Sequence, residues 1–163
     1  MTTASKDNPL GPRHADIEVW LRALESASRE QLDAVRQARS AGDYERENRA
    51  HTEALALAQR HERLDAWHAA RILAAETAAR SVAASCAEAA VEMARATSLQ
   101  ASAAVEWTAV VAAQRSSARD LCEWIIEAAT HAAEALVVRD LLPAEPFAVL
   151  WAPFQGWPNG ANG

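Results

Sequence analysis

His61, Asp65 and His68 are the residues of this sequence whose types and spacing come closest to a site for chemistry. If their segment is helical, the i, i+4, i+7 spacing places all three on one face. A carboxylate one turn from an imidazole can share a metal ion with it or orient the ring for proton transfer. The two histidines lie about 10 Å apart along such a helix, so one ion needs further ligands from a second helix. The spacing allows two interpretations. One is a metal or acid–base site, and the other is that these histidines mark the solvated end of an apolar stripe.

A second polar stripe combines Glu127, His131 and Glu134 with Glu123 one turn earlier. A di-iron bundle needs two Glu-x-x-His pairs and two further inward carboxylates, and the sequence lacks that pattern. Because the stripe lies opposite a broad apolar face, we expect it to be a solvated helix surface. Arginines also recur in near pairs that are interleaved with acidic residues, which is typical of a solvated face with ion pairs within a helix. The pairs are Arg36/Arg39, Arg46/Arg49 and Arg60/Arg63.

The composition narrows the class of protein. The chain has 163 residues, of which 41 are alanine, with 23% charged residues and a formal net charge of −6. That length fits one domain, and the acidic balance argues against a nucleic-acid binder because phosphate contacts need a surplus of Lys and Arg. The uncharged run of residues 96–105 is about half of what a membrane span needs, and no charged-then-apolar signal segment opens the chain. We therefore expect a cytoplasmic protein that binds neither nucleic acid nor membrane and needs no cofactor.

Proline and glycine mark the boundaries of the predicted helical part. Residues 43–142 contain neither residue type, and a strand-rich fold could not be connected over that interval without turn residues. The predicted fold is an all-α, up-down bundle of three to four helices, two of them long and coiled-coil-like. Gly42 is expected as a left-handed C-cap and Asp43 as an N-cap, in a tight turn whose two helices pack antiparallel. Residues 97–100 have capping-box form, and we expect the long helical segment to fold back there.

These signals divide the chain into three parts. The expected parts are a flexible N-terminal segment (1–13), a bundle (14–142) with helices at about 15–41, 44–96 and 98–141, and an aromatic tail (143–163) with a short helix and a frayed end. Cys86 and Cys122 are too few and too far apart for a disulfide framework or a metal knuckle. On apolar helix positions, each is expected to act as a small hydrophobe.

Two segments indicate association with a partner. Residues 81–118 contain only five charged residues, and their small side chains allow helices to approach closely, either inside the bundle or in an oligomer. The tail concentrates large apolar side chains that form an adhesive patch if they are exposed. They either cap the chain's own bundle or dock into the groove of a partner subunit. These candidate interface residues are Phe147, Leu150, Trp151, Phe154 and Trp157.

Three function hypotheses follow. The leading one is a non-enzymatic helical interaction or assembly protein, a homo-oligomer or a small subunit of a larger complex. The second is a helical sensor or carrier that binds a small apolar ligand in a pocket lined by tryptophans. The third is the metal site at His61, Asp65 and His68. Six tryptophans are available for the second, at positions 20, 67, 107, 124, 151 and 157.

Overall fold

All regular elements in the part of the chain that the structure describes are helices. The computed structural model describes residues 8–98 and 104–159, with side chains described for 8–87 and 121–159. Within those residues there are six α-helices and two short 3-10 helices, so the all-α expectation is confirmed, but the helices are more numerous than the expected three or four. They are η1 (Gly11–Arg13), α1 (His14–Glu25), α2 (Arg29–Ser40), α3 (Tyr44–Arg60), α4 (Leu64–Ser98), α5 (Ala104–Val137), α6 (Ala144–Trp151) and η2 (Ala152–Phe154).

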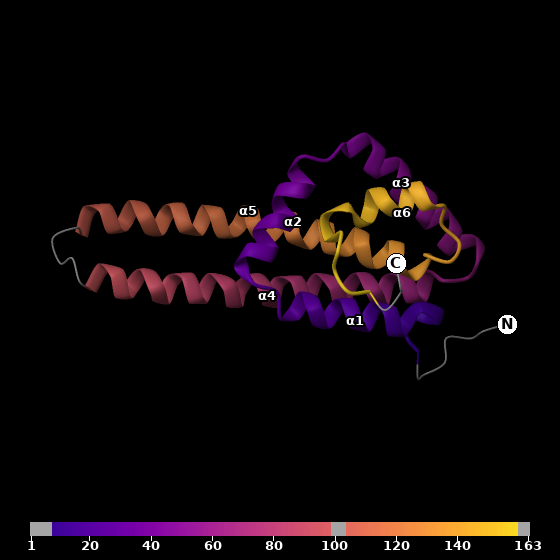
Figure 1. The fold of residues 1–163 in the computed structure, drawn as a ribbon, viewed down its shortest axis with the longest axis horizontal. Helices are drawn as coiled ribbons and strands as arrows, with labels where there is room; N and C mark the ends of the chain where they lie inside the picture. Colours follow the sequence, from indigo (N-terminus) through magenta and orange to yellow (C-terminus); the bar gives the residue numbers. More distant parts are fainter. Residues whose placement is uncertain (1–7, 99–103, 160–163) are drawn as a thin grey trace.

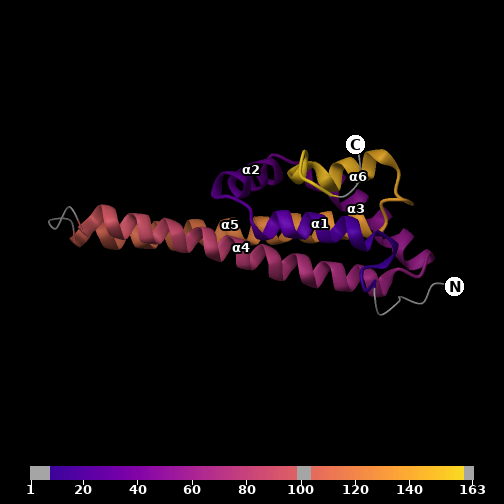
Figure 2. The same ribbon diagram turned by 60° about the horizontal axis from the view of Figure 1, so that its bottom comes forward.

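The two longest helices, α4 and α5, form an antiparallel hairpin that runs the length of the molecule (Figure 1). The other helices gather around one end of it: α1 packs on α4, α2 packs on α5, and α6 packs on both α3 and α5. The far part of the hairpin extends beyond them in both views (Figure 2). The chain reverses between Ser98 and Ala104, where a fold-back was expected, although residues 99–103 lie outside the described part.

The helix expected over 15–41 is interrupted at residues 26–28. Ser28 is an N-cap with a complete capping box. The backbone amide of Gln31 donates to Ser28 Oγ (3.1 Å), and the backbone amide of Ser28 donates to the side-chain oxygen Oε1 of Gln31 (2.9 Å). These two hydrogen bonds satisfy backbone donors that a new helix start leaves free. The single-helix expectation was therefore wrong, and the chain turns from α1 beside α4 to α2 on α5.

The helix expected over 44–96 is also interrupted, at residues 61–63. The Arg63 amide donates to the Ala58 carbonyl (2.8 Å) and the Glu62 amide to the Gln59 carbonyl (3.4 Å). This is the Schellman pattern that ends a helix, and Glu62 takes the left-handed position with φ 57°. Because that position usually holds Gly or Asn, nothing in the sequence marked this helix end.

The turn between α2 and α3 is confirmed in part. Asp43 caps α3 by accepting hydrogen bonds from the amides of Glu45 (3.0 Å) and Arg46 (3.2 Å). Gly42 does not have the expected left-handed conformation; among the described glycines only Gly11 and Gly156 have positive φ. A Cβ at Gly42 would lie 3.3 Å from the Arg39 carbonyl oxygen, so a close approach is what favours glycine there. The two helices pack on α5 and the tail rather than antiparallel on each other.

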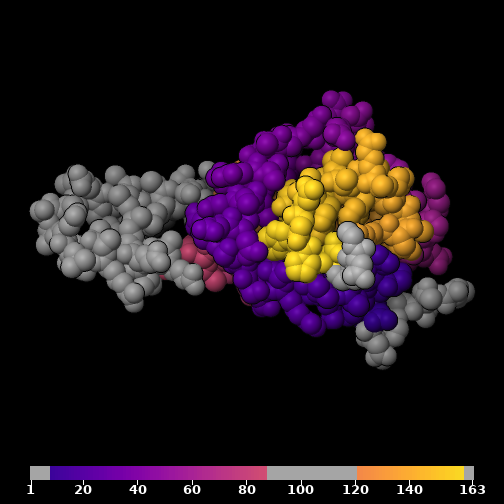
Figure 3. Space-filling model, in the orientation of Figure 1, coloured from indigo at the N-terminus to yellow at the C-terminus, as the bar shows by residue number. Residues whose placement is uncertain are grey.

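The tail packs on its own chain. Figure 3 shows it seated against the N-terminal helices. The ring of Trp20 on α1 lies 5.8 Å from the Trp151 ring and 5.2 Å, edge-on, from that of Phe154 (centroid distances). Trp20 and Phe154 are fully buried, and Leu10, from the segment that was expected to be flexible, also belongs to this core.

None of the described helices combines the length and the apolar character that crossing a bilayer requires.

We call the covered end of the hairpin, together with the helices that pack on it, the body. A group of hydrogen bonds, which we call the clip, joins the start of α4 to the end of α5 at one end of the body. Arg63 donates two hydrogen bonds to Asp140, at 2.6 and 2.9 Å, and a third to the Val137 carbonyl at 3.1 Å. The two hydrogen bonds that Asp140 accepts from Arg63 outweigh partial burial and hold the pKa of Asp140 below its ordinary value. The clip ties the turn after α3 to the C-terminus of α5.

Replacing Asp140 with Asn is expected to weaken the acid dependence of stability. A lowered folded-state pKa gives Asp140 a stabilising contribution that is present above its unfolded value of about 3.9 and is lost as the pH falls through the folded value. Because the carboxylate is 37% exposed, we expect a loss of about 1 kcal/mol or less above pH 5. Urea unfolding between pH 2.5 and 6 gives the free energy of unfolding at each pH, with Asp65→Asn, at an exposed position of α4, as the control. If this free energy falls equally with decreasing pH in wild type and in Asp140→Asn, the result would contradict this role of Asp140.

Replacing Phe154 with Ala is expected to lower the free energy of unfolding by about 3–5 kcal/mol, the range for a fully buried aromatic ring. Thermal or urea unfolding at a protein concentration too low for association gives the value. The matched control is Phe147→Ala, because that ring is only half-buried and stacks on Trp151 at 5.9 Å. If Phe154→Ala leaves the monomer's stability unchanged, the tail does not belong to the chain's own core.

Candidate functional site

Charged and titratable side chains from three helices meet inside the body. We call this group the ionic cluster. It consists of Arg39 from α2, Glu47 and His51 from α3, and Glu127, His131 and Glu134 from α5. Charged groups enter a protein interior only where they are paired, because desolvation is costly. The cluster is therefore the candidate functional site among the described side chains.

Arg39 is the cation of the cluster and is only 7% exposed. Its Nη1 lies 2.8 Å from Glu47 Oε2, and its Nη2 donates to Glu127 Oε2 at 3.1 Å. The guanidinium also lies over two aromatic rings, at 4.9 Å from the Tyr44 centroid and 5.6 Å from that of Trp124. Such cation–π contacts suit a planar, weakly hydrated cation. Arg39 is thus held from two sides and joins α2 to both α3 and α5.

Two histidine–glutamate pairs form the rest of the cluster. His131 Nδ1 makes a short contact with Glu47 Oε1, and His51 Nε2 lies 2.5 Å from Glu134 Oε2. The two imidazole rings lie against each other with centroids 4.7 Å apart, and Trp67 of α4 approaches the His51 ring at 5.5 Å. Glu134 is 2% exposed, so protein groups rather than water surround its carboxyl group. Each carboxylate therefore bridges α3 and α5.

The spacing of residues along each helix explains why the pairs form. Glu47 and His51 are one turn apart on α3, and His131 and Glu134 are about one turn apart on α5. Residues three or four apart share a helix face, so each helix presents one imidazole and one carboxylate to the other. The contacts join 47 to 131 and 51 to 134, in the same order along both helices, so α3 and α5 run in the same direction here.

The solvated-face expectation for this stripe was wrong for two of its four members. His131 and Glu134 are covered by α3, whereas Glu123 and Glu127, the latter with its side chain 61% exposed, face the solvent as expected. Arg39 was likewise expected on a solvated face and is buried. The complementary order of Glu47, His51, His131 and Glu134 was readable in the sequence. It becomes informative only once α3 and α5 are known to pack together.

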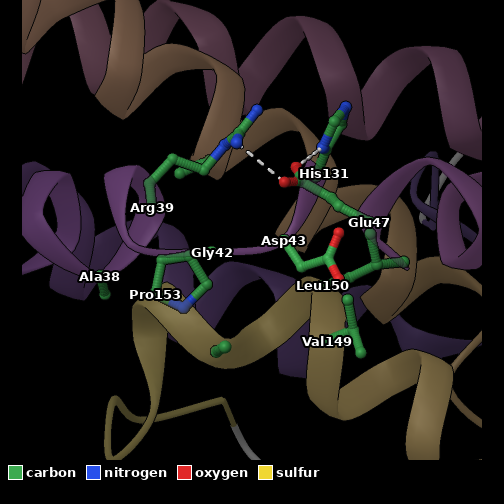
Figure 4. Close-up of a pocket in the computed structure, with 11 residues that line it drawn as sticks. Ala38, Arg39, Gly42, Asp43, Glu47, His131, Val149, Leu150 and Pro153 are labelled. Carbon is green, nitrogen blue, oxygen red and sulfur yellow. Dashed lines mark hydrogen bonds and ion pairs between the residues drawn. The ribbon is translucent and has the colours of Figure 1, made fainter. Parts of the chain in front are cut away.

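A small cavity of about 40 Å³ lies beside the cluster (Figure 4). Arg39, Glu47 and His131 contribute its polar side, while Leu150 and Pro153 of the tail close it from the other side. This volume fits about two or three water molecules. No tryptophan lines it. Among the described side chains, Trp20 and Trp151 instead pack on each other, Trp67 on His51 and Trp124 on Tyr44.

The residues proposed for a metal site do not share a helix. His61 is the C-cap of α3, whereas Asp65 and His68 lie in the first turns of α4, and all three are exposed. The common face that the spacing predicted is therefore absent, because the chain turns at Glu62. Where side chains are described, no group of three or more His, Cys, Asp or Glu residues is placed to hold a metal ion.

The predicted interface residues of the tail lie mainly inside this chain. Leu150, Trp151 and Phe154 are buried, while Phe147 and Trp157 are half-buried at the edge.

The two cysteines, Cys86 on α4 and Cys122 on α5, are partly buried free thiols on facing helices, and Arg29 Nη1 lies 3.9 Å from Cys86 Sγ. Burial, with smaller contributions from Cys86 and Glu123, raises the pKa of the Cys122 thiol. That favours the protonated and therefore less nucleophilic form of Cys122 at neutral pH.

No protein-family model, curated protein or solved structure matches this chain.

Replacing Arg39 with Met is expected to lower the free energy of unfolding by about 3 kcal/mol, because it leaves the buried Glu47 without its cation. Adding Glu47→Gln to that variant removes the uncompensated charge and is expected to recover part of the loss. Urea unfolding of the two single variants and the double variant gives the coupling energy. Arg49→Met, at an exposed position of α3, is the control. Additive effects of the two changes would contradict a coupled pair.

Proposed function

We propose that this protein is a non-enzymatic helical assembly protein that self-associates through the projecting part of the α4–α5 hairpin. We call that part the arm and define it as residues 88–98 and 104–120. The observation behind the proposal is that no other described helix runs along the arm, whereas the rest of the hairpin is covered by α1, α2, α3 and α6 (Figures 1 and 2).

The composition of the arm supports association. Residues 81–118 carry only five charged residues and are rich in Ala, Ser, Thr and Val. Two helices can cover only part of each other's circumference. A second hairpin packed against it makes a four-helix bundle, the common arrangement for antiparallel helix pairs. Small residues favour this because they let helices approach closely.

The size of the arm indicates weak association. Seventeen residues of helix extend about 25 Å, and two helices side by side are about 20 Å wide. A face of that size covers about 500 Å² on each copy, or about 1000 Å² in total, which is the lower limit for a specific interface. We therefore expect dimers that form and dissociate with concentration.

Removing about three helical turns from each side of the arm, residues 88–98 and 104–114, tests the proposal. Whole turns preserve the helical phase and leave residues 99–103 to connect the shortened helices. Light scattering over a concentration series is expected to show a rising mass for wild type and a constant monomer mass for the shortened chain, with the helical circular-dichroism signal reduced only by the deleted residues.

The control is Ile72→Glu, which changes the most exposed large apolar side chain of the body while leaving the arm intact. It is expected to associate like wild type. Dissociation of Ile72→Glu but not of the shortened chain would assign association to the body and contradict the arm. A wild-type chain that stays monomeric at the highest concentration would rule out self-association.

A further inference from the structure

Helix α3 is anchored to the body by very little apolar area. Its buried apolar residues are Ala50, Ala54 and Ala58, one per turn, and Leu55 and Leu57 are only partly buried. A buried methyl group contributes much less than the 1.5–3 kcal/mol of a large aliphatic side chain. The other buried residue of α3 is Glu47, which belongs to the ionic cluster. Helix α3 also packs on α6, but its docking on α5 depends strongly on the polar contacts of that cluster.

The charges of the cluster do not balance without protons on its histidines. Arg39 supplies one positive charge, and Glu47, Glu127 and Glu134 supply three negative charges. With both imidazoles neutral the cluster carries two excess negative charges, and with both protonated it is neutral. Glu134 is the clearest case, because it is 2% exposed and its ion-pair partner is His51. An uncompensated charge at such a position is strongly destabilising.

The groups that face the two rings come from each helix packed around them. They are Arg39 on α2, Asp43 and Glu47 on α3, and Glu127 and Glu134 on α5. Helix α4 contributes the uncharged Trp67 ring, and α6 contributes Val149 and Leu150 at the cavity. Arg39, already shared by Glu47 and Glu127, is the one fixed cation among these facing groups. Asp43 is exposed, and its carboxylate already caps α3. Protonated His51 and His131 are therefore the charges that match the carboxylates of the ionic cluster that Arg39 leaves unpaired.

We propose that α3 is a proton-dependent latch, which is docked on α5 when His51 and His131 are protonated and is released when both lose their protons. The docked state then binds more protons than the released state, so docking weakens as the pH rises through the range in which histidines titrate. Two linked protons change the docking equilibrium by at most about a hundredfold per pH unit, and one by about tenfold. This latch does not rest on the association through the arm.

Hydrogen exchange of the wild-type protein at pH 6 and pH 8 tests the latch. After correction for the intrinsic exchange rate, amides of α3 are expected to lose at least about tenfold in protection at pH 8. Amides of α4 and α5 within the covered part of the hairpin are expected to keep theirs. A change of less than about twofold in α3, or an equal loss in all helices, would overturn the proposal.

The double variant His51→Gln/His131→Gln keeps hydrogen-bonding side chains at both positions but cannot take up the protons. Its α3 is expected to exchange as fast at pH 6 as wild-type α3 does at pH 8, with no further pH dependence. His61→Gln/His68→Gln removes two exposed histidines and is expected to behave like wild type. A pH dependence that disappears in this control variant instead would contradict the latch. If the first variant does not fold, the wild-type comparison still decides.

Discussion

Alanine limits how much apolar area the helices of this chain bury against one another. The α4–α5 seam is built largely from alanines such as Ala70, Ala74, Ala78, Ala128 and Ala132, and the buried apolar face of α3 consists only of alanines. Small side chains allow close contact but remove little apolar surface from water. The body therefore relies on a few concentrated anchors. These are the aromatic group of Trp20, Trp151 and Phe154, the ionic cluster, and the Arg63–Asp140 clip.

The features that local sequence signals specify were largely predictable. The absence of Pro and Gly over residues 43–142 predicted an all-helical chain, and Asp43 marked the start of α3. The interruption before α2 was also readable, because Ser28 and Gln31 form a capping box. The end of α3 was not, because Glu62 occupies a left-handed position without the glycine that usually marks it. That missed turn also produced the metal-site hypothesis, which required His61 and His68 on one helix.

The ionic cluster shows why charged positions are hard to interpret from one sequence. Glu134 and His131 lie on the polar side of α5, which in an isolated amphipathic helix faces water. Here a second helix with its own polar residues covers that side, so both polar faces become an interior surface. A periodicity argument assigns each helix one buried face and cannot identify a contact between two polar faces. The tail residues were identified as a group, but their packing on Trp20 depends on how α1 lies, which is tertiary information.

Because α3 buries no large side chain, the polar pairs of the ionic cluster determine its register along α5. The buried alanines of α3 repeat every four residues, so a shift of α3 by one turn along α5 would still place alanine at two of the three buried positions. Apolar contacts therefore hardly distinguish the observed register from its neighbours. The pairs of Glu47 with His131 and His51 with Glu134 do distinguish it, because a one-turn shift separates both carboxylates from both imidazoles. Such specificity from buried polar pairs comes at a cost in desolvation. In an alanine-rich body these pairs, despite that cost, fix α3 in one position on α5, and they make that position sensitive to the charge state of two histidines.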